Sequence, residues 1–144
     1  MNRILVALDR SPRAETVLAR AALIAKLTGA ELYLFHAVSV PVEVPPEAFT
    51  SSPTELVEKW RMDALRELEK RSREVDPEVV THVVARAGSP WSGICASAKA
   101  HDVDLIVIGS HGYGLLDHLL GTTASKVVNH ADRSVLVVRE PKRG

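Results

Sequence analysis

Residues that could hold a phosphate chain gather in the last third of this 144-residue chain. Gly109 and Gly112 follow an apolar run, and Gly121, Thr122 and Thr123 come directly before a stretch with helical periodicity. Glycines lack the Cβ atoms that hold a ligand away from the backbone, and a helix N-terminus offers unpaired N–H groups and a partial positive charge. The pattern indicates a phosphate-binding site; the alternative is glycines that only make turns. No Gly-Lys-Ser/Thr sequence occurs, so this is not a Walker motif.

Asp9 is a second residue with the chemistry of a binding site, because it lies where the first apolar run, 4–8, ends. Its carboxylate has acceptor oxygens for an exocyclic amine or a sugar hydroxyl. Ligands of parallel α/β sheets lie outside the carboxyl ends of the strands. The alternative role for Asp9 is a cap on the first helix. Ser11 before Pro12 predicts a helix that Ser11 caps and that begins with the proline.

The histidines do not have the spacing of a metal site on one helix. His111 lies inside the glycine-rich segment and could contact a phosphate or a bound divalent ion. His36, near the end of the second predicted strand, is interpreted as a structural histidine held by a hydrogen bond. Ser110, His111 and Asp9 could form a triad on paper, but the residues around Ser110 do not match a nucleophile elbow.

Alternating strand and helix patterns must position these residues. Short apolar runs predict strands over 4–8, 31–38, 79–87, 103–108 and 135–138. Helical periodicity and capping signals predict helices over 13–27, 54–73, 90–100 and 122–130. The prolines within 39–53 predict an irregular surface loop. This alternation predicts one α/β domain over residues 1–144, with a parallel sheet covered on both faces.

The overall composition excludes several classes of partner. Eighteen basic side chains balance eighteen acidic ones, so no net field attracts nucleic acid or an anionic membrane. No apolar run approaches the roughly 20 residues of a membrane span, and the N-terminal residues lack the pattern of a secretory signal. The single Cys95 excludes an internal disulfide and is interpreted as a buried, inert thiol. We therefore expect a cytoplasmic protein that binds no nucleic acid and does not insert into membranes.

The whole chain resembles the universal stress protein family, whose nucleotide-binding members carry Gly-x2-Gly-x9-Gly-Ser/Thr after the fourth strand. Gly109 and Gly112 match the first half of this pattern, and Gly121 with Thr122 matches the second. Eight residues, rather than nine, separate Gly112 from Gly121. Residues 4–11, 32–38 and 129–139 carry the rest of the likeness.

This resemblance implies a flavodoxin-like, doubly wound, five-stranded parallel sheet in the order 3-2-1-4-5. It also implies a site for ATP, with Mg2+, at the carboxyl ends of the first and fourth strands. Asp9 is expected to bind the base or the ribose, beside an adenine slot lined by Ala7, Leu8 and Ala37. The expected ribose and phosphate contacts come from the two glycine segments: Ile108, Gly109, His111, Gly112, Gly121, Thr122 and Thr123.

Three functions are compatible with these residues. The first is a nucleotide-responsive stress module that acts through an unidentified protein partner. The second is a slow ATPase or self-phosphorylating enzyme, with Ser110, Thr122 or Thr123 as phosphate acceptor, and the third is a dimeric interaction protein that binds no nucleotide. The first is favoured because a general base, an arginine finger and a Walker lysine are not recognisable. The last strand, from Val135 to Val138, is expected at a sheet edge, where unpaired backbone groups favour a homodimer.

Overall fold

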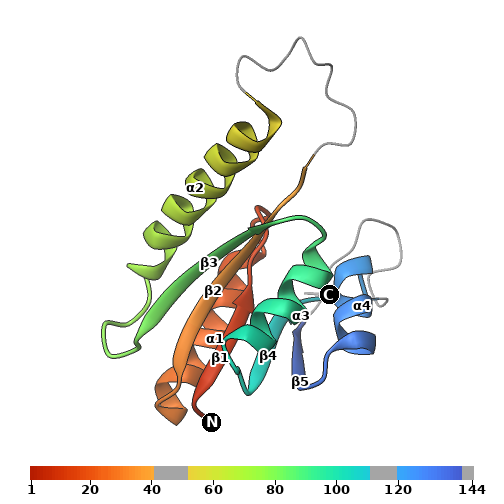
Figure 1. The fold of residues 1–144 in the computed structure, drawn as a ribbon. Helices are drawn as coiled ribbons and strands as arrows, with labels where there is room; N and C mark the ends of the chain where they lie inside the picture. Colours follow the sequence, from red (N-terminus) through yellow and green to blue (C-terminus); the bar gives the residue numbers. More distant parts are fainter. Residues whose placement is uncertain (41–51, 111–119, 141–144) are drawn as a thin grey trace.

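A five-stranded parallel sheet in the order β3-β2-β1-β4-β5 forms the centre of the molecule (Figure 1). The computed structural model describes residues 1–40, 52–110 and 120–140. The strands are β1 (Arg3–Ala7), β2 (Glu31–Val38), β3 (Thr81–Ala87), β4 (Leu105–Gly109) and β5 (Ser134–Val138). The helices between them are α1 (Ala14–Thr28), α2 (Pro53–Ser72), α3 (Pro90–Ala100) and α4 (Thr122–His130). The predicted fold class and strand order are confirmed.

The middle residues of the central strands are mostly apolar because helices cover both faces of the sheet. In β1, Ile4, Leu5 and Val6 are fully buried although their side chains alternate between the two faces. The edge strand β5 is different, since Val138 is buried while Leu136 stays 38% exposed. Burial therefore falls off toward this edge of the sheet.

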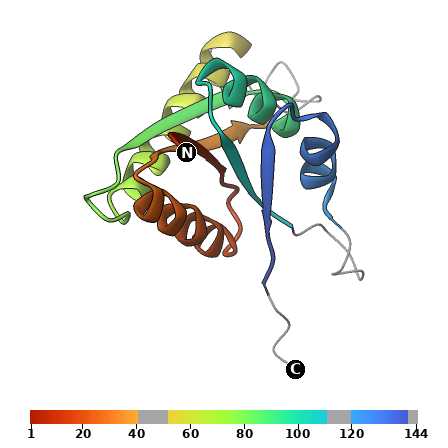
Figure 2. The same cartoon turned by 90° about the horizontal axis from the view of Figure 1, so that it is seen from below.

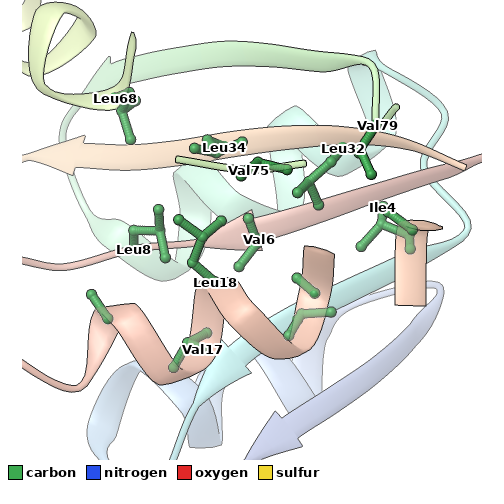
Figure 3. Close-up of a cluster of buried hydrophobic side chains, with 14 of the residues drawn as sticks. Ile4, Val6, Leu8, Val17, Leu18, Leu32, Leu34, Leu68, Val75 and Val79 are labelled. Carbon is green, nitrogen blue, oxygen red and sulfur yellow. The ribbon is translucent and has the colours of Figure 1, made fainter. Parts of the chain in front are cut away.

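Two hydrophobic layers hold the helices to the sheet. On one face, α1 and Leu68 of α2 pack against side chains of the sheet such as Val6 and Leu34 (Figure 3). On the other face, Phe35 and Ile106 pack against α3 and α4. Figure 2 shows α1 on one side of the strands and α3 and α4 on the other. The winding direction of the chain thus reverses between β1 and β4, which is where sheets of this kind bind ligands.

The start of α1 differs from the prediction. Arg13, not Ser11, is the N-cap residue, and no side-chain hydrogen bond caps this helix. The N–H of Ser11 donates to Asp9 Oδ1 at 2.9 Å, and the N–H of Ala14 donates to the Ser11 carbonyl at 3.2 Å. These two bonds fold 9–14 into a turn, so the helix begins only after Pro12 and Arg13.

The fourth strand begins later than predicted, at Leu105 rather than at Val103. The N–H of Val103 donates to the carbonyl of Ala98 at 3.0 Å, so Val103 belongs to the turn that leaves α3. None of the helices in the described ranges is long and apolar enough to cross a membrane.

Candidate functional site

The two glycine segments predicted to bind phosphate meet at the carboxyl end of β4. The N–H of Ser110 donates to the carbonyl of Val138 at 3.0 Å, which extends the pairing of β4 with β5 by one residue. The carbonyl of Ser110 then accepts a hydrogen bond of 3.0 Å from the N–H of Gly121. The chain that leaves β4 after Gly109 therefore returns to the same point before α4 begins.

The N-terminus of α4 presents its first backbone N–H groups at this point. Gly121 is the N-cap residue, is buried and has extended backbone with φ −63° and ψ 166°. Gly121 has no side chain with which to cap α4, and the first turn of the helix holds no acidic residue. The first N–H groups of a helix have no intrahelical partner, and they carry the positive end of the helix dipole. Thr122 is exposed and Thr123 is partly buried, and both residues belong to the first turn of α4.

Asp9 lies on the same edge, directly after β1. Its carboxylate is exposed and accepts the N–H of Ser11 at 2.9 Å. The alternative role predicted for Asp9 was a cap on the first helix. The hydrogen bond from Ser11 lies close to that role, but it closes the turn before α1 and does not cap the helix itself. A carboxylate has about four acceptor positions, and the N–H of Ser11 occupies one of them.

The predicted adenine slot divides between the two faces of the sheet. Ala7 and Ala37 are partly buried and pack on the face of α3 and α4. Leu8 is only 5% exposed, and its side chain lies in the layer under α1, as Figure 3 shows. Ile108 is buried in the layer under α3 and α4. Because the side chains of Leu8 and Ile108 lie in the core, these residues can contact a ligand at this edge only through their backbone groups. Ala7 and Ala37 have small side chains, which leave space for a ligand there.

His36 makes the structural hydrogen bond that was predicted for it. Its Nδ1 atom lies 2.7 Å from the carbonyl oxygen of Leu8, and the ring is partly buried. His111 and Gly112, the other predicted site residues, fall outside the described residues.

One part of the edge was not identified from the sequence. Gly88 follows β3 with φ +121°, a conformation that favours glycine, and its N–H donates to the carbonyl of Val38 at 3.0 Å. The carboxyl ends of β2 and β3 are thereby joined beside Ala37. The sequence Gly88, Ser89 and Pro90 at the end of a predicted strand was the signal that could have revealed it.

Other reactive groups do not form a centre within the described ranges. There, no three His, Cys, Asp or Glu side chains come close enough to hold a metal ion. Cys95 is only partly buried, although a buried thiol was predicted. Burial raises the pKa of this thiol, and the carboxylate of Asp132 raises it further. Cys95 is therefore held in the protonated, less reactive form.

Comparisons with known proteins identify the family of this chain. The model of the universal stress protein family matches residues 1–139. A universal stress protein of Methanocaldococcus jannaschii is 34% identical over 123 residues, which cover 83% of this chain and 71% of the relative. A universal stress protein of Synechocystis is 30% identical over 150 residues, covering 96% and 97% of the two chains.

Solved structures have the same fold. Universal stress protein UspA from Lactobacillus plantarum superposes with a TM-score of 0.79 at 29% identity, covering 96% of this chain and 97% of that one. The Archaeoglobus fulgidus universal stress protein in complex with dAMP gives a TM-score of 0.62 at 23% identity, with coverages of 96% and 98%. A universal stress protein in complex with cAMP gives 0.68 at 22%, with coverages of 97% and 98%. The family model, the relatives and the fold agree, and the chain belongs to the universal stress protein family.

Proposed function

We propose that this chain binds an adenine nucleotide, ATP with Mg2+ in the first place, in the crevice between the carboxyl ends of β1 and β4. The bound state is then read by a protein partner as part of a stress response. One observation carries the proposal: the Gly121 N–H to Ser110 carbonyl hydrogen bond seats the N-terminus of α4 against the end of β4. Universal stress proteins of the same fold are known in complex with dAMP and with cAMP, which supports an adenine nucleotide as the ligand class.

Backbone donors suit the phosphate end because the chain has no net charge to attract a polyanion. In this proposal, Gly109 and Gly121 allow the phosphates to approach the backbone, and Thr122 and Thr123 add N–H and hydroxyl donors. His111 and Gly112 complete the phosphate side. Mg2+ would be held mainly by phosphate oxygens, as is usual for this ion, since the described residues contain no cluster of metal-ligating side chains.

In this proposal, the nucleoside of the ligand binds on the β1 side of the site. Ala7 and Ala37 are small and share one face of the sheet, so a flat base fits beside them. Asp9 offers its carboxylate to a ribose hydroxyl or an exocyclic amine. Leu8 and Ile108 contribute backbone groups, because their side chains belong to the core.

A pair of threonine substitutions tests the phosphate end. Thr123 is the second residue of α4 and Thr54 is the second residue of α2, so the two occupy equivalent helix positions. Thr123→Val should weaken ATP binding by about 1.5–3 kcal/mol, the value of a hydrogen bond to a charged group, whereas Thr54→Val should leave it unchanged. Isothermal titration calorimetry measures both. Equal ATP affinities of wild type and Thr123→Val would show that the Thr123 hydroxyl does not hold phosphate.

Gly121→Val is a stronger test of the same end. Its φ and ψ lie in the extended region that a β-branched residue adopts, so the backbone does not require glycine for its conformation. The added methyl groups would instead occupy the space that the phosphates need, and ATP binding should be lost. Native circular dichroism together with unchanged ATP affinity would remove α4 from the proposed site.

We also propose that the chain forms a homodimer through β5. The carbonyl of Val138 faces β4, where it accepts the N–H of Ser110. Alternation along the strand therefore turns the N–H and C=O groups of Val135 and Val137 toward the open edge. Arg133 does not cover this edge, because its guanidinium donates inward to the carbonyls of Ala98 and Val103. Two copies related by a two-fold axis can pair these strands antiparallel.

A further inference from the structure

The short contact between His36 and Leu8 replaces a hydrogen bond that a regular sheet would make here. The N–H of Leu8 donates to the carbonyl of Phe35 at 2.8 Å, so β1 and β2 are still paired one residue beyond β1. In a parallel ladder the next hydrogen bond runs from the Ala37 N–H to the Leu8 carbonyl. Among the backbone hydrogen bonds of the described residues this one is not formed. The Leu8 oxygen lies 2.7 Å from His36 Nδ1 instead.

The chemistry of the contact determines which atom carries the proton. A carbonyl oxygen only accepts hydrogen bonds, so Nδ1 of His36 must be the donor. The side chain of His36 projects on the face of the sheet covered by α1 and α2, because Leu34 and Val38 project there and side chains alternate along a strand. The Leu8 carbonyl therefore turns out of the ladder toward that face, and β1 separates from β2 at this point.

This separation leaves a backbone donor pointing into the gap. The N–H of Glu31 donates to Asn2 beside β1, whereas the N–H of Leu32 donates to Val80 beside β3. Odd-numbered residues of β2 thus face β1, and the Ala37 N–H faces the gap that opens after Leu8. The gap lies at the edge where the nucleoside end of the ligand is proposed to bind.

The same contact also fixes Asp9. The Leu8 carbonyl belongs to the planar peptide unit that contains the nitrogen of Asp9, so fixing its oxygen fixes the direction in which Asp9 leaves the sheet. On its other side, the Asp9 carboxylate is held by the N–H of Ser11 at 2.9 Å. Asp9 is therefore held from both sides, by one hydrogen bond to the peptide before it and by one to its own side chain.

We propose that His36 is a positioning residue of the nucleotide site, an inference that rests on the proposed function. Its Nδ1–H holds the Leu8 carbonyl out of the ladder, which keeps the gap between β1 and β2 open and orients Asp9 toward the nucleoside. His36 does not itself contact the ligand. An aliphatic side chain of similar size cannot hold the Leu8 carbonyl, because it has no hydrogen-bond donor. Asparagine can hold it, because its Nδ2–H lies close to the position of His36 Nδ1.

Substitutions at His36, combined with one at Asp9, test this role. His36→Leu should weaken the binding of adenosine and of ATP equally, by about tenfold, the upper end for one hydrogen bond. His36→Asn should remain within about threefold of wild type, because it keeps the donor. His82→Leu is the matched control, since this exposed histidine of β3 pairs beside Tyr33 near the opposite end of the sheet. The double variant Asp9→Ala/His36→Leu should lose less affinity than the sum of the two single losses, because His36 acts in part through Asp9.

The outcomes separate this inference from the proposed function. If wild type binds neither ATP nor adenosine in calorimetry, the proposed function is wrong and the inference falls with it. If wild type binds and His36→Leu binds equally well with a native circular dichroism spectrum, only the positioning role is wrong. Additive losses in the double variant would also overturn it. If His36→Leu fails to fold, two other measurements test the role: the affinity of His36→Asn and the 15N spectrum of the wild-type imidazole. Weak binding by the asparagine variant refutes the positioning role. An Nδ1 atom without a proton refutes it as well.

Discussion

The substitution Val137→Pro tests the proposed dimer contact separately from the stability of the protomer. Because the carbonyl of Val138 accepts the N–H of Ser110, the N–H of Val137 points away from β4 and toward the open edge. Val137→Pro removes this outward donor and leaves the pairing of β5 with β4 intact, which is the position where sheets tolerate proline. Leu136→Pro is the matched control. Its N–H faces β4, so that variant loses a hydrogen bond inside the sheet.

The expected size of the effect follows from the symmetry of the contact. In a two-fold dimer both protomers lose the same donor, so Val137→Pro removes two hydrogen bonds from each dimer. At a net value of about 0.5–1.5 kcal/mol each, the dimer loses about 1–3 kcal/mol of association free energy. The dissociation constant should therefore rise about 5- to 150-fold. The free energy of unfolding of the protomer should change less than it does in Leu136→Pro.

Sedimentation velocity over a series of protein concentrations measures the dissociation constants, and chemical denaturation measures the stability of each variant. Two results would refute the reasoning. One is wild type that sediments as a monomer at micromolar concentration. The other is a folded Val137→Pro whose dissociation constant equals that of wild type.

Two further predictions concern carboxylates. Asp9→Ala should weaken ATP and adenosine alike, by about 1–3 kcal/mol for one hydrogen bond to a charged group, in calorimetry; a loss for ATP alone would place Asp9 at the phosphates. The backbone N–H groups of Arg3 and Asn2, at 2.8 and 2.6 Å, hold the pKa of the Asp104 carboxyl below its usual range. A lowered pKa stabilises the fold above the unfolded pKa of about 3.9, and this contribution is lost as the pH falls through the folded value. Denaturation of wild type and Asp104→Asn should therefore show a stability difference that is constant near neutral pH and shrinks below about pH 4; a difference that does not change with pH would contradict it.

The fold was predictable because its signals are long and agree with one another. Each predicted strand matches an observed strand to within two residues at either end, since a run such as Leu105 to Ile108 is buried from both sides and must be apolar throughout. The two strands that begin later than predicted do so because their first apolar residues, Val79 and Val103, are buried in turns rather than in the ladder. Apolar character indicates burial, but it does not indicate which buried residues are hydrogen-bonded to a neighbouring strand.

The first residues of the helices were harder to predict, because the same short sequence precedes helices that are capped in different ways. The sequence Ser-Pro stands before three helices of this chain, at Ser11, Ser52 and Ser89. Ser52 caps α2 through its side chain, which accepts the N–H of Glu55 at 3.2 Å. Ser89 is the N-cap of α3 without a side-chain bond, and Ser11 is no cap at all. At Ser11 the chain first forms a turn, in which the N–H of Ser11 donates to Asp9 and the N–H of Ala14 donates to the Ser11 carbonyl, and the helix begins at Ala14.

The sequence predicts a candidate site at the carboxyl ends of β1 and β4, and the structure places Asp9, Gly109 and Gly121 at that edge. Which groups would contact a ligand there could not be predicted. The residues expected there include Leu8 and Ile108, whose side chains lie in the two hydrophobic layers, so they can serve the site only through their peptide groups. A sequence does not reveal which backbone groups are exposed, except where the residues are small enough to leave the backbone uncovered. Ala37, Gly109 and Gly121 are residues of this kind. The contact of His36 with the Leu8 carbonyl changes the direction of such a group, and no spacing rule predicts it because the two residues lie on different strands. In the proposed site, the phosphates are bound mainly by backbone donors at the N-terminus of α4. Gly121→Val, which blocks peptide groups at the phosphate end, should therefore abolish ATP binding, whereas the loss of the charged side chain in Asp9→Ala should only weaken it.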